Sequence, residues 1–126
     1  MIVRSFPAER SSLAAIRRMV REAARALDLS ETSTADVVLA ASEASANAVV
    51  HSGATEVRVT WLTYGDCLEI SVHDNGVYAR RVTSGPASEG GRGLQVIMAL
   101  MDEVSVHEGT AAHPGTTVMM MKCRGA

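Results

Sequence analysis

The chain has 126 residues and a mass of 13.3 kDa, the size of one globular domain. Its 12 Lys and Arg and 14 Asp and Glu give a formal net charge of −2, which excludes a protein that binds nucleic acid by covering phosphates with cations. Apolar residues make up 47% of the chain and aromatic residues only 3%, so the predicted core consists of aliphatic side chains and methionine.

The positions of lysine and cysteine exclude further classes of protein chemistry. Lys122 is the only lysine and lies in an apolar run near the C-terminus, which excludes the Gly-rich lysine loop of P-loop nucleotide-binding proteins. Cys67 and Cys123 match no metal-ligand or redox spacing, so we expect free thiols in a reducing compartment. No apolar run approaches the roughly 18 residues of a membrane span. The sequence therefore predicts a soluble, cytoplasmic protein without a membrane anchor.

The N-terminal part of the chain predicts a strand followed by an amphipathic helix. Residues Met1–Phe6 indicate a short strand that Pro7 ends. Residues Glu9–Leu27 have the apolar spacing of a helix and carry a second stripe of arginines. This stripe consists of Arg17, Arg21 and Arg25. We interpret it as a solvated helix face, with a partner-binding surface as the alternative.

A second helix is predicted to begin after Ser30, a favoured N-cap residue, and to extend to about His51. It is rich in alanine, and small side chains allow a helix to lie close to a sheet or to another helix. Ser52-Gly53 is expected to end it, because glycine readily adopts the left-handed conformation that follows many helices.

The remainder of the chain predicts a hairpin, a long loop, a helix and two more strands. Residues Thr55–Tyr64 and Cys67–His73 alternate in polarity around a tight turn, as in a β-hairpin. Residues 76–93 contain five glycines, one proline and few apolar side chains, so this segment is predicted to be a functional loop. The later elements are expected at Leu94–Met101 (helix), Glu103–His107 (strand) and Thr116–Cys123 (strand). This order predicts an α+β fold with helices on one face of one sheet.

Three polar residues of the second helix form a stripe. Glu43, Asn47 and His51 are four residues apart, so they share one face of the helix. One interpretation is a ligand site, in which the carboxylate polarises a nucleophile and the amide oxygen helps to hold a hard cation. The other interpretation is a solvated polar face.

Three further segments carry candidate ligand-binding residues. Asp74-Asn75-Gly76 follows a predicted strand, where a carboxylate can accept a hydrogen bond and a glycine allows close approach of a ligand. Gly90-Gly91-Arg92-Gly93-Leu94 leads into a helix, and the N–H groups of a helix N-terminus suit phosphate. Gly115-Thr116-Thr117 opens the last strand. Each motif alone also has an ordinary explanation, as a turn, a helix start or a strand start.

Taken together and in chain order, these segments resemble the motifs of the GHKL ATPase superfamily, the Bergerat-fold nucleotide binders. The segment SEASANAVVHSG resembles the N-box. The segments DNG at 74–76, GGRGL at 90–94 and GTTV at 115–118 resemble the three glycine boxes. The short chain and the segment GLQVIMALMDEVSV are similar to the anti-sigma-factor serine-protein kinases of bacteria. The resemblance covers nearly the whole chain.

This resemblance implies one domain over residues 1–126, built as a two-layer α/β sandwich with helices on one face of a mixed, mostly antiparallel sheet. It also implies ATP and Mg²⁺ as cofactors. Glu43 would be the catalytic base that activates the attacking hydroxyl, and Asn47 would ligate Mg²⁺. Asp74 would accept a hydrogen bond from the adenine amino group, assisted by Thr117.

The same resemblance implies the remaining nucleotide contacts. Residues 77–92 would form a mobile ATP lid. The glycines of the motifs would let the backbone approach the nucleotide and its phosphates. The further residues expected at the nucleotide are His51, Gly76, Gly91, Arg92, Gly93 and Leu94.

Two departures from the family pattern support a second hypothesis. Tyr78 stands where the first glycine box often has its second glycine, and Glu89 stands where some relatives carry an arginine. The leading hypothesis is an ATP-dependent serine-protein kinase that phosphorylates a serine of an anti-sigma-factor antagonist and regulates a sigma factor. The alternative is a nucleotide-binding regulatory module with weak or no catalysis. A detached catalytic domain of a sensor histidine kinase ranks last.

The predicted partners are therefore proteins. The resemblance implies a sigma factor and an antagonist that carries the phosphoacceptor serine. The strand at Met1–Phe6 offers a sheet edge for pairing with a second copy, so a homodimer is a further expectation. Neither nucleic acid nor a membrane is an expected partner.

Overall fold

A computed structural model describes residues 1–51, 53–76, 89–110, 112 and 114–125. The helices of this described part are α1 (Ser12–Ala26), α2 (Glu31–His51) and α4 (Glu89–Leu100). Its strands are β1 (Ile2–Pro7), β2 (Glu56–Tyr64), β3 (Cys67–Asp74), β4 (Glu103–Glu108) and β5 (Thr116–Cys123). None of the described helices is long and apolar enough to cross a membrane.

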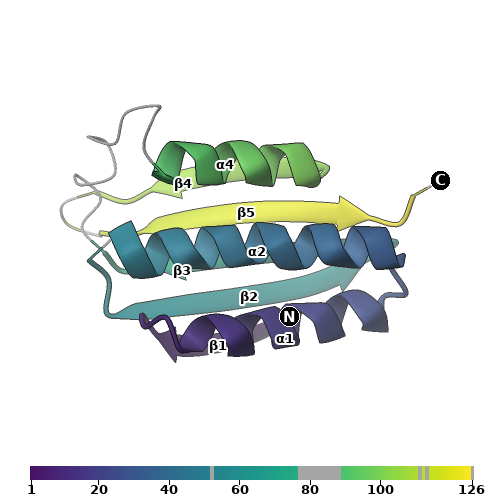
Figure 1. Cartoon of the computed structure of the whole chain (residues 1–126), viewed down its shortest axis with the longest axis horizontal. Helices are drawn as coiled ribbons and strands as arrows, with labels where there is room; N and C mark the ends of the chain where they lie inside the picture. Colours follow the sequence, from purple (N-terminus) through teal and green to yellow (C-terminus); the bar gives the residue numbers. More distant parts are fainter. Residues whose placement is uncertain (52, 77–88, 111, 113, 126) are drawn as a thin grey trace.

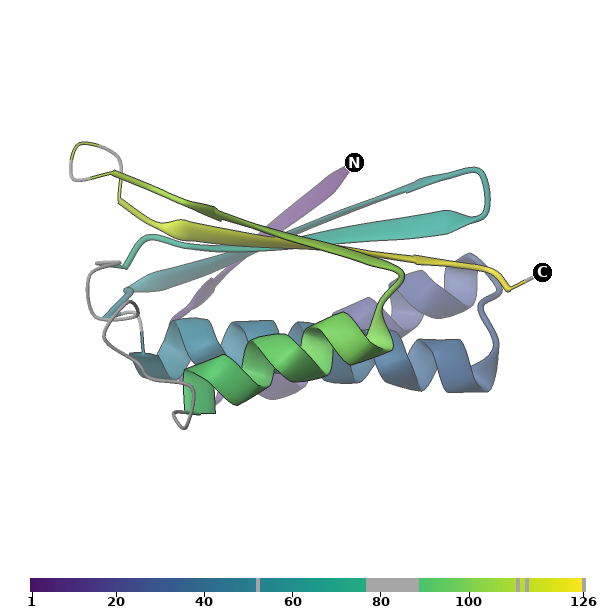
Figure 2. The same cartoon turned by 90° about the horizontal axis from the view of Figure 1, so that it is seen from above.

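The elements form two layers. The five described strands make one sheet in the order β1-β2-β3-β5-β4, and every neighbouring pair in it is antiparallel. The view from above shows all three described helices on the same side of this sheet (Figure 2). The predicted two-layer α+β sandwich is confirmed, with a sheet that is antiparallel throughout its described pairings.

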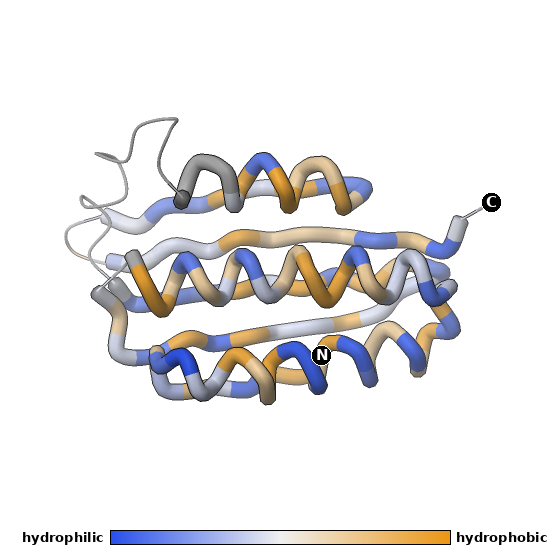
Figure 3. The backbone as a smooth tube through the Cα atoms, in the orientation of Figure 1, coloured by the Kyte–Doolittle hydropathy of each residue, from blue (hydrophilic) through white to orange (hydrophobic). Residues whose placement is uncertain are grey.

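The core lies between the two layers. The apolar stripe of α1 places Ile16, Val20 and Ala24 against the rest of the protein with almost no exposed surface. α2 contacts both α1 and α4 and lies over the middle of the sheet (Figure 1). Apolar positions recur along the helices and the central strands (Figure 3). The alanines of α2 at the interface are small, which lets the helix pack closely between its neighbours; they are Ala40, Ala41, Ala44 and Ala48.

The start of α2 agrees with the capping pattern of the sequence. The Oγ atom of Ser30 accepts a hydrogen bond from the backbone N–H of Ser33 at 3.0 Å, which satisfies one of the free donors of the first helical turn. The helix runs to His51, and Gly53 follows with a φ angle of 71°. The helix therefore has the bounds that the sequence predicted.

The third described helix begins earlier than predicted. α4 starts at Glu89, so the glycines at 90–93 lie in its first turns rather than in the loop before it. The sequence predicted these glycines in the loop before the helix, and in a helix interior each glycine costs about 1 kcal/mol relative to alanine. Packing of α4 against α2 outweighs this preference. The last four residues of the predicted lid, 89–92, consequently belong to α4.

Lys122 joins three elements. Its Nζ atom donates to the backbone oxygen of Leu100 at the end of α4 at 2.6 Å, and it forms an ion pair with Asp36 of α2 at 3.4 Å. The ammonium group thus satisfies a free carbonyl at a helix C-terminus, where a positive charge is favourable. The only lysine of the chain therefore connects β5 to the helix layer.

The two cysteines are bonded to each other, contrary to the expectation of free thiols. Cys67 and Cys123 are directly opposite in the antiparallel pairing of β3 with β5 and form a disulfide. Their sequence separation is 56, so no local spacing motif indicated that they form a pair. The register of the sheet brings them together.

We expect reduction of this disulfide to lower the free energy of unfolding by about 4 kcal/mol, because the bond closes a long loop in the unfolded chain. Urea unfolding of the oxidised protein with and without dithiothreitol measures the difference. The double variant Cys67→Ser/Cys123→Ser should match the reduced protein and show no response to dithiothreitol. Identical urea midpoints for oxidised and reduced protein would contradict this expectation.

Candidate functional site

The sequence-predicted motifs gather at one end of the sandwich. The C-terminal part of α2, the end of β3, the start of α4 and the start of β5 all lie at the left end in Figure 1. These four segments are far apart in the sequence. Their convergence follows from the antiparallel sheet, in which β3 ends where its neighbour β5 begins.

Asn47 and Gly93 form the closest contact between the motifs. A Cβ atom built on Gly93 would lie 2.8 Å from the Nδ2 atom and 3.3 Å from the Oδ1 atom of Asn47. Separations below 3.0 Å do not occur for real Cβ atoms, so the amide of Asn47 occupies the space that any other residue at 93 would fill. Glu43 is half-buried and lies one helical turn before Asn47, on the same face of α2. The structure therefore joins the N-box to the second glycine box.

Asp74 is a buried carboxylate at the end of β3. It is 4% exposed and faces the helices, in line with the buried side chains of Leu68, Ile70 and Val72 on alternate positions. Its Oδ1 atom accepts a hydrogen bond from the backbone N–H of Gly76 at 2.9 Å. This bond holds the turn after β3 against the carboxylate, as the Asp-Asn-Gly sequence indicated.

The register places Thr116, and not Thr117, beside Asp74. Thr116 is the direct partner of Asp74 in the β3–β5 pairing and is 2% exposed. Thr117 is the partner of His73, and its Oγ1 atom lies 2.8 Å from the Nδ1 atom of that histidine. Successive side chains of a strand point to opposite faces, so the two threonines lie on opposite sides of the sheet. The prediction that Thr117 assists Asp74 does not fit this geometry.

Gly115 allows the start of β5 to pass close to the end of β3. Its φ angle is 131°, which favours glycine, and a Cβ atom at this position would clash with the backbone oxygen of Asp74. Gly115 therefore sets the approach of Thr116 to Asp74. The third glycine box thus has a steric explanation in this structure.

Asn75 was not singled out as a site residue in the sequence, yet its side chain fixes the end of β3. Its Oδ1 atom accepts hydrogen bonds from the backbone N–H groups of Thr55 at 3.0 Å and Glu56 at 3.2 Å. Its Nδ2 atom donates to the Oγ1 atom of Thr55 at 2.9 Å. These bonds tie the turn after β3 to the start of β2. An asparagine in a turn was the available signal, because its amide readily bonds to nearby backbone.

For some predicted site residues, only the position in a helix is described, and part of the predicted lid lies outside the described residues. His51 is the last residue of α2, and Gly91 and Arg92 lie in the first turns of α4. Leu94 follows Gly93 in the same helix and is half-buried. Of the predicted lid, residues 77–88 lie outside the described part of the chain.

The described residues fit an adenine nucleotide with a divalent cation. The Oγ1 atom of Thr116 is buried without a hydrogen-bond partner among the described residues, and a buried hydroxyl in this state is costly unless a ligand or water bonds to it. Asp74 next to it offers an acceptor, as an exocyclic amino group requires. The amide oxygen of Asn47 is a hard ligand of the kind that Mg²⁺ accepts.

Comparison with known proteins identifies the class to which this fold and site belong. The chain belongs to the histidine kinase-like ATPase domain family, whose model matches residues 6–122. The predicted membership of the GHKL superfamily is thereby confirmed.

The relatives are serine-protein kinases. The chain is 38% identical to the serine-protein kinase RsbW of Bacillus pumilus over 106 residues, which are 69% of this chain and 63% of that protein. It is 32% identical to RsbW of Bacillus subtilis, over 92% of this chain and 81% of that protein. These relatives confirm the predicted anti-sigma-factor kinase group. They also confirm the predicted enzyme class, an ATP-dependent serine-protein kinase.

A solved structure has the same fold. The crystal structure of the RsbU and RsbW domains of Rv1364c from Mycobacterium tuberculosis superposes with a TM-score of 0.75 at 25% sequence identity. The match covers 100% of this chain and 34% of that one. This chain thus corresponds to about one third of the larger protein.

Proposed function

We propose that this chain is an ATP-dependent serine-protein kinase that transfers the terminal phosphoryl group of ATP to a serine hydroxyl of a partner protein. The observation that carries the proposal is the contact of α2 with α4, where Gly93 lies against the amide of Asn47. Glu43 lies one turn away on the same helix face. A carboxylate and an amide in this arrangement suit a base and a cation ligand that serve one reacting group.

The proposed roles follow from the chemistry of each side chain. Bound Mg²⁺ supplies positive charge that stabilises the phosphates during transfer. Asn47 holds the cation through its amide oxygen, in an orientation limited by the contact with Gly93. Glu43 accepts the proton of the attacking serine hydroxyl, whose oxygen forms the new bond to phosphorus while ADP leaves. Asp74, with Thr116 beside it, accepts a hydrogen bond from the adenine amino group and orients the nucleotide.

The proposed protein substrate is an anti-sigma-factor antagonist, and a sigma factor is the second proposed partner. A groove of about 300 Å³ between α1 and α2 supports binding of an acidic protein surface. Arg17, Arg21 and Arg25 line it, and none of them forms an ion pair with another described residue. Arg17 also donates to the Oγ atom of Ser42 on α2 at 3.4 Å. This member of the arginine stripe therefore contacts the neighbouring helix and is not only solvated.

A homodimer remains part of the proposal. β1 is an edge strand of the sheet, and its residues Ile2 and Val3 are exposed. An edge strand with exposed apolar side chains is suited to pairing with a second copy of the chain.

Phosphoryl transfer is tested by incubating the purified protein with labelled ATP, Mg²⁺ and candidate antagonist proteins of the same organism. We expect label on a serine of one antagonist and none on its Ser→Ala variant. Glu89 at the start of α4 reverses the charge of an arginine found in some relatives and supports the alternative, a regulatory module that binds nucleotide without catalysis. ATP binding by calorimetry without transfer to any candidate would favour that alternative.

We expect ATP to bind 10- to 100-fold more tightly than GTP. GTP carries a carbonyl where adenine has its amino group, so the carboxylate of Asp74 would face a second acceptor, which costs about 1–3 kcal/mol. Titration calorimetry with the two nucleotides under identical conditions measures the ratio. Equal dissociation constants for ATP and GTP would show that Asp74 does not bind the adenine amino group.

A further inference from the structure

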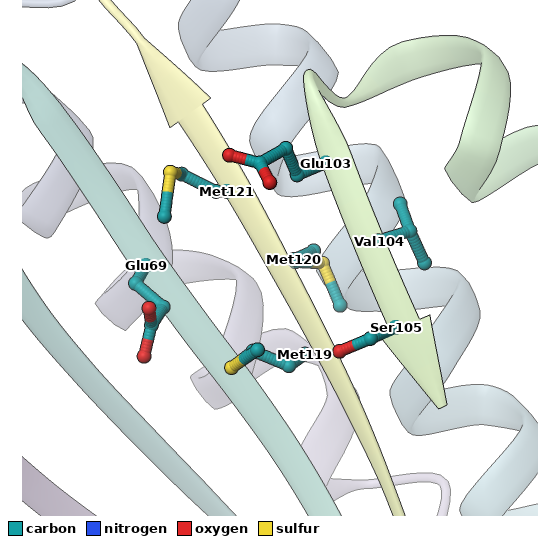
Figure 4. Close-up of a pocket in the computed structure, with 7 residues that line it drawn as sticks. All are labelled: Glu69, Glu103, Val104, Ser105, Met119, Met120 and Met121. Atoms are coloured by element: carbon teal, nitrogen blue, oxygen red, sulfur yellow. The ribbon is translucent and has the colours of Figure 1, made fainter. Parts of the chain in front are cut away.

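The sheet face opposite the helices carries ordered rows of side chains. In the row that crosses β3, β5 and β4, Glu69 pairs with Met121 and Met121 pairs with Glu103. The neighbouring row contains Met119 and Ser105. Met120, between the two methionines, is buried in the core, so Met119 and Met121 point to the open face. Figure 4 shows this face with the helices behind the sheet.

These residues and Val104 line a shallow pocket of about 160 Å³, in which Met121 lies between the strands that carry the two glutamates. The phenol of Tyr64 borders it, donating to the Oε1 atom of Glu69 at 3.3 Å and lying 3.8 Å from the sulfur of Met121. We name the set of Tyr64, Glu69, Glu103, Met119 and Met121 the open-face pocket.

The carboxylates of the open-face pocket lack a cationic partner among the described residues. The ion pairs found in that part of the chain join Lys122 to Asp36 and Arg124 to Asp66. Partial desolvation and the negative charges of Glu69 and Glu103 raise the pKa of the Tyr64 phenol. Both carboxylates therefore act electrostatically on the same region of the surface.

The geometry of the open-face pocket favours a guanidinium group as its ligand. β3 and β4 flank β5, so the backbones that carry the two carboxylates are about 10 Å apart, twice the spacing of neighbouring strands. A guanidinium has five N–H donors in a planar fork and can bond to two carboxylates at once. The thioether of Met121 is a polarizable contact for the methylene stem, and the Tyr64 ring is suited to a cation–π contact.

We propose that the open-face pocket is a docking site for an arginine of a partner protein, with the guanidinium between Glu69 and Glu103 and its stem on Met121. The site is separate from the proposed kinase site. Glu69 precedes Asp74 by five residues, about 17 Å along a strand, and points to the opposite face of the sheet. Binding at this pocket does not depend on phosphoryl transfer. A metal ion fits less well, because thioethers are poor ligands for Mg²⁺ and Ca²⁺.

Methionine methyl NMR tests this directly, because three of the seven methionines line the pocket and two of them, Met119 and Met121, point to the open face. The probe is the blocked peptide acetyl-Leu-Arg-Leu-amide, compared with the same peptide carrying neutral citrulline. We expect saturable shifts of the Met119 and Met121 methyl signals with the arginine peptide and at least tenfold weaker binding of the citrulline peptide. Met98 on α4, which is 62% exposed, is the internal control and should not shift.

A matched pair of double variants then distinguishes the effect of these two carboxylates on peptide binding from the effect of the protein's net charge. Glu69→Gln/Glu103→Gln should weaken binding of the arginine peptide at least tenfold. Glu22→Gln/Glu56→Gln removes the same charge from exposed positions on α1 and β2 and should leave binding unchanged. Raising the salt concentration from 50 to 500 mM should weaken binding to the wild type, because the attraction is electrostatic.

Four results would overturn the proposal. Equal affinity for the arginine and citrulline peptides would show that charge is not recognised, and unchanged affinity in Glu69→Gln/Glu103→Gln would place binding elsewhere. Shifts of Met121 with CaCl₂ at lower concentrations than with the peptide would assign the pocket to a cation. Shifts that follow protein concentration without peptide would assign the face to a second copy of the chain.

Discussion

Replacement of Glu43 by glutamine is expected to lower the rate of phosphoryl transfer on the order of 10²–10⁴-fold, the usual contribution of a positioned acid–base group. Glutamine keeps the size of the side chain but cannot accept the proton of the serine hydroxyl. Nucleotide affinity should stay equal or become slightly tighter, because a negative charge near the phosphates is removed. Single-turnover phosphorylation of the antagonist and titration calorimetry measure the two effects separately.

Asn47→Ala is the matched control for this variant, since Asn47 lies one turn away on the same helix face. It removes a proposed cation ligand, so the affinity for Mg·ATP should fall while the affinity for nucleotide without Mg²⁺ changes less. Transfer by Glu43→Gln at the wild-type rate would show that Glu43 is not the base. Equal loss of affinity with and without Mg²⁺ in Asn47→Ala would contradict the proposed role of Asn47.

Replacement of Gly93 by alanine should lower the affinity for Mg·ATP on the order of 10- to 100-fold, the usual effect of disturbing the orientation of a metal ligand. The new Cβ atom would lie 2.8 Å from the Nδ2 atom of Asn47. The contacted atoms are the free end of a side chain, so the amide should move while the backbone of α4 stays in place. Stability should change little, because alanine gains about 1 kcal/mol of helix propensity.

Two further variants make this test specific. Gly125→Ala adds the same methyl group where no atom lies within 4 Å, so its affinity for Mg·ATP should equal that of the wild type. In an Asn47→Ala background, the contact is already removed and Gly93→Ala should have little further effect, which is the non-additivity expected of touching residues. Additive losses in the double variant would mean that Gly93 acts independently of Asn47.

The local elements followed from the sequence because their causes are local. Ser30 has a side-chain oxygen that can reach a backbone N–H of the first helical turn, and it caps α2 in the structure. The residues of β3 alternate between buried and half-buried as the polarity pattern predicted. The four motifs in chain order predicted the family, which the comparison with known proteins confirmed.

The beginning of α4 could not be read from the sequence. The glycines at 90–93 have low helix propensity, so the predicted helix began at Leu94. In the structure the helix extends back to Glu89, and Gly93 lies against Asn47 of α2. The helical conformation at Gly93 therefore goes with a contact to a residue more than 40 positions away in the chain. Local helix propensity does not include such a contact.

By itself the sequence determined the class of fold, the polar stripe on α2, the turn at Asp74 and the family, because helical spacing, strand alternation and turn chemistry act over a few residues. Tertiary structure decided which threonine accompanies Asp74. The last strand is apolar on both faces from Val118 to Met121, so its alternation did not reveal which side faces the helices. Pairing with β3 settles this and places Thr116 beside Asp74. The same register joins Cys67 to Cys123, because side chains distant in sequence meet only when the sheet forms.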